Sequence, residues 1–153
     1  AIGCCTAARD LSMPPDDATT TGLAAAGWKP MPASDYPALV GPFLARRDGD
    51  GWRYGFVAEQ RHLNLGGVVH GGMLMSFADD ALGATVWQSV GRKPCTTVQL
   101  STQFVSPVRL GELVEVRAEI LRATRTVVFV RGVLEVGGRP VVHADGVWKI
   151  LGA

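Results

Sequence analysis

One segment near the middle of the chain restricts its possible folds more than any other. Residues 71–90 contain no proline, and apolar side chains occur on nearly every face of the helix that they can form. A helix that is apolar all round is buried. The segment is long enough to span a membrane, but Asp79 and Asp80 lie at its middle and three glycines interrupt it. We therefore expect a central helix in the core of a globular domain.

After this helix the sequence changes to the alternation typical of β-strands. Apolar and polar side chains alternate in residues 96–105, 113–123, 126–136 and 141–151, and Gly137-Gly138 fits a tight hairpin turn. Before the helix, residues 48–51 predict a turn and residues 52–57 a further strand. One long helix wrapped by an antiparallel meander of strands is the α+β layout called the hot dog fold. We assign residues 46–153 to such a domain.

The N-terminal part of the chain has a different composition. Six of the nine prolines fall within residues 14–42. Because proline lacks a backbone N–H and interrupts regular structure, this composition predicts an extended arm over residues 1–45, broken by a short helix near residues 36–44.

The overall composition excludes several classes of protein. Apolar residues make up 47% and charged residues 19% of the 153, which indicates a globular chain. The formal net charge is +1, so we expect neither a nucleic acid nor a membrane as partner. The three cysteines have no metal-ligand spacing, His62 and His143 have no paired ligand, and no apolar signal segment begins the sequence. We expect reduced thiols, no metal and a cytoplasmic location.

The two adjacent aspartates of the central helix point to different faces, because neighbouring helical positions differ by about 100°. A buried carboxylate without a partner costs free energy, so both need an explanation. Asp79 shares a stripe of small and polar residues with Gly72, Ser76 and Gly83. Small side chains allow a ligand to approach closely, so we expect Asp79 to be the functional residue. We expect Asp80, on a bulkier stripe, to be a structural carboxylate that is paired or reaches solvent.

A glycine-rich segment, residues 64–72, leads into the helix. Free backbone N–H groups at a helix N-terminus can bind a carbonyl or oxyanion oxygen. Gly71 and Asp79 are eight residues apart, or about 12 Å along a helix. A single carbonyl cannot contact both residues on one helix. If both act on one substrate, they come from different copies of the chain, and the site lies in a homodimer interface.

These residues together resemble a known family. The pattern formed by Asn64, Gly67 and His70-Gly71-Gly72, with an acid nine residues after the histidine, is similar to that of the PaaI-type hot dog acyl-CoA thioesterases. Thr97 and the segment at residues 106–112 extend the resemblance, which covers about residues 50–151. The family implies a homodimer or homotetramer that hydrolyses an acyl-CoA to a free acid and coenzyme A, without a cofactor.

The resemblance also implies a role for each matching residue. Asp79 would be the nucleophile or the base that activates water, and the backbone N–H of Gly71 from the partner subunit would polarise the thioester carbonyl. His70 would support that loop or the leaving thiolate, Asn64 would orient water or substrate, and Thr97 would align the water or the carboxylate. The residues expected to bind the coenzyme A ester are Gly72, Thr124, Arg125 and Arg109.

Two other functions remain open from the sequence. Dehydratases of the same fold also use a buried acid and a histidine, so enoyl-CoA hydration or 3-hydroxyacyl-CoA dehydration is an alternative reaction on the same class of ligand. The second alternative is a non-catalytic acyl-CoA-binding module, which would bind the ester tightly and release no thiol.

Overall fold

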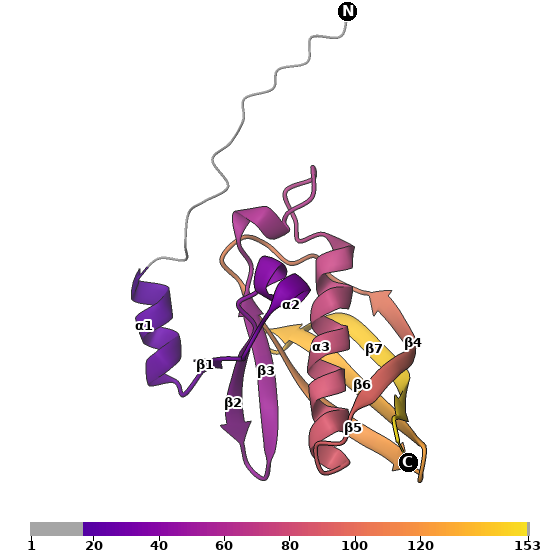
Figure 1. The fold of residues 1–153 in the computed structure, drawn as a ribbon. Coiled ribbons are helices and arrows are strands. Elements are labelled where there is room, and N and C mark those ends of the chain that lie inside the picture. The colour runs from indigo at the N-terminus through magenta and orange to yellow at the C-terminus, as the bar shows by residue number, and fades with distance from the viewer. Residues whose placement is uncertain (1–16, 153) are drawn as a thin grey trace, which may run out of the picture.

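The computed structural model describes residues 17–152, and its centre is one long helix, α3 (Gly71–Ser89), against one antiparallel sheet (Figure 1). The strands in chain order are β1 (Lys29–Pro30), β2 (Leu44–Asp48), β3 (Gly51–Val57), β4 (Cys95–Phe104), β5 (Leu113–Ala123), β6 (Val127–Val136) and β7 (Arg139–Ile150). Across the sheet their order is β1-β2-β3-β5-β6-β7-β4. A long helix wrapped by an antiparallel sheet is the hot dog fold, so the predicted fold class is confirmed.

Helix α3 is buried on one side only. The side chains that face the sheet repeat at helical spacing and are Met73, Leu74, Phe77, Ala78, Ala81, Leu82 and Val86. The ring of Phe77 lies 4.9 Å from that of Phe56 and 5.3 Å from that of Phe43, between centroids, at the centre of the core. On the opposite side, Met75 and Trp87 are 40% and 39% exposed. The apolar pattern predicted burial on every side, but within one chain the sheet covers only half of the helix.

The five predicted strands, β3 to β7, have the predicted extents to within two residues, whereas β1 and β2 were not predicted, and the strand order differs from a simple meander. β5, β6 and β7 are neighbours in sequence order, and the glycines of the β6–β7 turn, Gly137 and Gly138, have φ angles of 55° and 82°. β4 does not lie beside β5; it pairs with β7, from Cys95 opposite Ile150 to Phe104 opposite Val142. Alternating polarity shows which residues face the core, but it does not specify which strands are neighbours.

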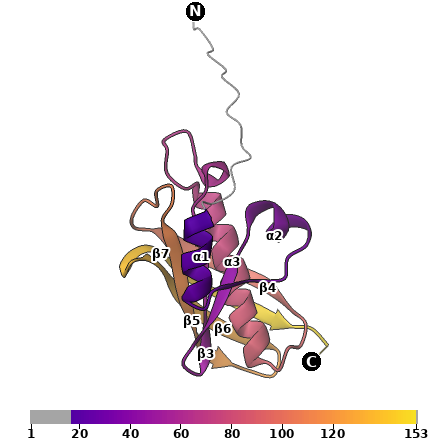
Figure 2. The same cartoon turned by 90° about the vertical axis from the view of Figure 1, so that its left-hand side faces the viewer.

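The N-terminal segment is more ordered than the extended arm expected from its prolines. It contains α1 (Asp17–Ala25), β1 and α2 (Asp35–Val40), and β2 begins at Leu44, before the predicted boundary at residue 45. Helix α1 forms because no proline occurs between residues 16 and 29. Figures 1 and 2 show α1 outside the sheet and α2 close to α3. The division of the chain into an arm and a domain remains a prediction, and residues 1–16 lie outside the described part.

Candidate active site

The first feature of the site is a pair of side chains that the fold brings together from α3 and β4. The hydroxyl of Thr97 donates a hydrogen bond of 2.8 Å to Oδ1 of Asp79. β4 is the last strand at its side of the sheet, and it runs beside α3. The pair is therefore accessible from the free edge of the sheet. Because Thr97 holds one carboxylate oxygen, Oδ2 of Asp79 is left for a substrate or a water molecule.

Asp80 lines the same cavity as Asp79 and is half-buried. Burial raises the pKa of Asp80, and the negative charge of Asp79 raises it further. Within residues 17–152 its carboxylate has neither a hydrogen bond nor an ion pair, so the paired carboxylate that we considered does not occur in the single chain. In the described chain only Asp79 has a hydrogen-bond partner, while both aspartates line the cavity, so the assignment of Asp79 as the functional residue remains a prediction.

The N-terminus of α3 supplies the second feature. His70 is the N-cap residue, and its Nδ1 accepts a 2.9 Å hydrogen bond from the N–H of Gly72. Its carbonyl oxygen accepts from the N–H groups of Met73 and Leu74. The N–H of Gly71 has no acceptor within the described residues. Of the first-turn donors, Gly71 is thus the one that can bind a substrate oxygen, whereas the N–H of Gly72 is used by the cap.

Asn64 shapes the loop that precedes this helix. Its Oδ1 accepts hydrogen bonds from the N–H groups of Gly66, at 2.8 Å, and Val68, at 3.4 Å. These contacts close the turn at residues 64–68 and leave the side-chain NH₂ of Asn64 exposed. A direct contact of Asn64 with a ligand would therefore be made by a donor, not by the amide oxygen.

His62 is buried and supports the same loop. Its Nδ1 accepts from the N–H of Glu59, and its Nε2 lies 2.9 Å from the carbonyl oxygen of Val40. Its own carbonyl accepts from the N–H of His70. Burial and the positive charge of Arg61 lower the pKa of His62 to about 4, although the contact with Val40 opposes this shift. The imidazole is therefore neutral at pH 7.

We expect this histidine to make folding stability depend on pH. Its pKa is about 4 in the folded chain and about 6.5 when unfolded, so the unfolded state binds more protons between these values. Stability is thus fully present above pH 6.5 and falls by up to about 1.4 kcal/mol per pH unit down to pH 4. Urea unfolding at pH 7.5, 5.5 and 4.5 measures this slope. The variant His62→Gln should lose much of it; an unchanged slope would contradict the assignment.

The basic residues expected to bind coenzyme A lie near opposite ends of helix α3. Arg109 is next to the start of α3, because the N–H of Val69 donates to the carbonyl of Val108. Thr124 and Arg125 form the exposed β5–β6 turn. That turn lies near the other end of α3, since Thr126 accepts from Ile150 and the adjacent Leu151 donates to Pro94. One chain therefore does not bring Arg109 and Arg125 to the same place.

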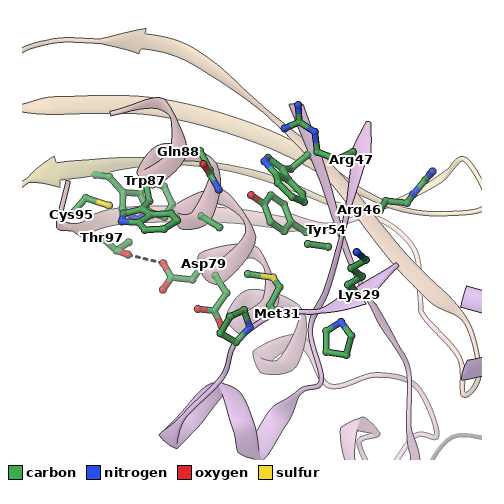
Figure 3. Close-up of a pocket in the computed structure, with 18 of the residues that line it drawn as sticks. Lys29, Met31, Arg46, Arg47, Tyr54, Asp79, Trp87, Gln88, Cys95 and Thr97 are labelled. Carbon is green, nitrogen blue, oxygen red and sulfur yellow. Dashed lines mark hydrogen bonds between the residues drawn. The ribbon is translucent and has the colours of Figure 1, made fainter. Parts of the chain in front are cut away.

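A large cavity of about 1040 Å³ opens beside Asp79. Figure 3 shows Asp79, Thr97 and Trp87 on one side of it and Tyr54 and Arg47 on the other. Sequence reasoning missed the second side, which comes from β2, β3 and the segment around β1. No local motif marks these residues, because only the pairing of β1 with β2 and of β2 with β3 carries them to α3.

No cluster of three or more histidine, cysteine or acidic side chains within residues 17–152 has the arrangement of a metal site. No helix in this range is long and apolar enough to cross a membrane.

Comparison with known proteins identifies the family. The profile of the Thioesterase superfamily matches residues 66–142, which is just over half of the chain and includes Gly71, Asp79 and Thr97. The Pseudomonas aeruginosa protein named Putative esterase PA0474 is 34% identical over 116 residues, which cover 73% of this chain and 85% of that protein. The chain belongs to the Thioesterase superfamily and is a thioester hydrolase. The resemblance found in the sequence is thereby confirmed.

Solved structures show the same fold. The conserved protein PA5202 from Pseudomonas aeruginosa superimposes with a TM-score of 0.72 at 28% identity, covering 78% of this chain and 95% of its own. A hypothetical thioesterase protein from Streptococcus pneumoniae, solved with coenzyme A, has a TM-score of 0.64 at 22% identity and covers 72% and 86% of the two chains. At that identity the second likeness concerns the fold alone.

Proposed function

We propose that the chain hydrolyses acyl-CoA thioesters at a site shared by two copies. The observation that carries this proposal is that helix α3 bears both a carboxylate and a free N–H donor, too far apart to act on the same carbonyl group. The carboxylate of Asp79, held by Thr97, faces the cavity, and the unpartnered N–H of Gly71 lies eight residues away. Eight helical residues span about 12 Å, which is too far for one carbonyl group. The coenzyme A held by the structurally similar Streptococcus pneumoniae protein supports this ester as the substrate.

The proposed reaction assigns a step to each group. Asp79 either attacks the thioester carbonyl carbon or removes a proton from the water that attacks it. The N–H of Gly71 in the second copy donates to the carbonyl oxygen, where negative charge develops in the transition state. If Asp79 is the base, the water oxygen bonds to the carbonyl carbon, the carbon–sulfur bond breaks, and the thiolate takes up the proton that Asp79 removed, which gives coenzyme A and a free acid. If Asp79 is the nucleophile, its oxygen displaces the thiolate to form a mixed anhydride. A water molecule then hydrolyses the anhydride to the free acid and aspartate, and one of its protons goes to the thiolate. Thr97 orients the Asp79 carboxylate, and His70 maintains the helix N-terminus that carries Gly71.

The free edge of the sheet supports a dimer. β4 pairs only with β7 among the described strands, so its other side presents unpaired backbone groups. Val98 is 62% exposed on this strand, and Phe104 and Val105 at its end are each 52% exposed. A second copy that pairs there would cover these side chains next to Thr97. Homotetramer formation and the cytoplasmic location stay predictions.

The shared site predicts complementation between two inactive variants. The first, Asp79→Asn, lacks the carboxylate; the second, Gly71→Pro, lacks the N–H donor. A hybrid dimer contains one site with both native groups, so equal co-expression with random pairing should restore about one quarter of the native activity. Each variant expressed alone, measured by thiol release, serves as the control. If both groups belonged to one chain, no hybrid would hold an intact site and the mixture would stay inactive.

The same thiol-release assay separates the alternative functions. Hydration of crotonyl-CoA consumes its conjugated double bond and releases no thiol, so absorbance and thiol readings distinguish it from hydrolysis. A binding module would retain acyl-CoA without either change.

A further inference from the structure

We propose that the 1040 Å³ cavity is the acyl compartment of the site, and that it selects apolar acyl groups of ring size or larger over acetyl. This inference rests on the proposed function, because it assumes that the reacting carbonyl lies at Asp79. Asp79 and Thr97 themselves line the cavity. An acyl group whose carbonyl contacts Asp79 therefore has this space open to its remaining carbon atoms.

The size of the cavity argues against a short acyl group. Pockets for small molecules are typically about 300–1000 Å³, and this one is at the upper end of that range. An acetyl group, at roughly 30 Å³ for each heavy atom, would occupy on the order of 100 Å³. Acetyl-CoA would leave most of the apolar wall in contact with water, so its binding would gain nothing from that surface.

Charged side chains also line the cavity, but the larger part of its wall is apolar. Trp87 and Ala84 come from α3, Trp52 and Tyr54 from β3, and Met31 from the residue after β1. Aromatic rings offer wide flat surfaces and bind both rings and alkyl chains. These side chains come from separate parts of the sequence and face one space, and this arrangement is typical of a binding pocket.

Gly83, from the stripe of small residues on α3, allows Trp148 to pack close to the helix at the cavity. A Cβ atom at Gly83 would lie 3.2 Å from Nε1 of Trp148, which is closer than an ordinary contact. The missing side chain lets the indole of Trp148 approach α3, and both residues line the cavity. Two residues of this stripe, Asp79 and Gly83, therefore line the cavity.

The segment around β1 is an anchored wall. Lys29 and Pro30 pair with Ala45 and Leu44, and the N–H of Met31 donates a 2.8 Å hydrogen bond to the carbonyl of Phe43. These bonds hold Met31 beside the cavity. The compartment therefore depends on the N-terminal segment as well as on the catalytic helix, and we infer that both determine specificity.

The test compares kcat/KM for benzoyl-CoA and decanoyl-CoA with that for acetyl-CoA, measured by thiol release. Burial of a ring or of several methylenes predicts that the larger esters are favoured by at least about 30-fold. Ala84→Trp fills the compartment and should lower this ratio by at least about 10-fold. Trp87→Ala removes a wall and should also lower it, without the risk of overpacking. Phe129→Ala is the matched control, because Phe129 is 40% exposed, like Trp87, but does not line the cavity.

The outcomes separate this inference from the proposed function. A ratio near one, or a ratio that Ala84→Trp and Trp87→Ala leave unchanged, overturns the acyl compartment if thiol release still depends on Asp79. If the kcat/KM ratio is unchanged and the cavity variants also form a smaller oligomer, the cavity is part of the interface between copies and not an acyl site. Failure to release thiol from every ester, by a folded protein, overturns the proposed function itself. A large ratio that falls in both cavity variants and not in Phe129→Ala supports the inference.

Discussion

The variant Asp79→Asn is expected to lose thioester hydrolysis by about 10²- to 10⁴-fold in kcat while the protein stays folded. Asparagine has nearly the same shape as aspartate and can still accept the hydrogen bond from Thr97 through its amide oxygen. It cannot act as a nucleophile or as a base at this position. The measurement is thiol release under saturating acyl-CoA, with circular dichroism and size-exclusion chromatography to show that folding and assembly persist.

Asp80→Asn is the matched control for this experiment. Both aspartates lie on α3 and line the cavity, but Asp80 has no hydroxyl partner within the described residues. Its pKa is raised, so ionised Asp80 costs stability that grows as the pH rises above its unfolded value of 3.8. The variant should therefore retain most of the activity and have a higher Tm at pH 7. If Asp80→Asn is the inactive variant, the assignment of the two aspartates is reversed.

Removal of the Gly71 N–H is expected to have the second largest effect. Gly71→Pro should lower kcat/KM by about 10²- to 10³-fold, the usual loss for one oxyanion donor. Proline is tolerated in the first turn of a helix, and the preceding His70, at φ −61° and ψ 134°, already has the extended conformation that proline requires. The helix should thus form, and kinetic analysis with a thermal melt separates a lost donor from a lost fold.

Gly71→Ala is the control that keeps the N–H. A Cβ at this position would lie 3.2 Å from Cζ of Phe104, whose half-exposed ring can move by the few tenths of an ångström required. Proline introduces the same Cβ, so both variants make this contact with Phe104, but only Gly71→Ala keeps the backbone N–H. Nearly native kcat/KM in Gly71→Pro would exclude the N–H from the reaction. Equal losses in both variants would indicate crowding by Phe104 instead.

The sequence alone was sufficient for the features that depend on local patterns. The apolar run predicted α3, and period-two alternation predicted β4 to β7. The resemblance of the loop before α3 placed the chain among the thioesterases, which the family comparison confirms. These features are readable because helix and strand periodicity determine directly which side chains share a face.

The tertiary structure decided everything that depends on pairing between distant segments. It placed β4 beside β7 and not beside β5, and it added helix α1 and strand β1 to the proline-rich segment. The buried His62 supports the loop before α3. It also brought Met31, Trp52 and Trp87, which are far apart in the sequence, to the lining of one cavity. Alternation specifies which face of a strand is apolar but not which strand lies next to it. For this reason the sequence by itself determined the helix and the strands that carry Asp79 and Thr97, and only the fold decided the shape of the space beside them.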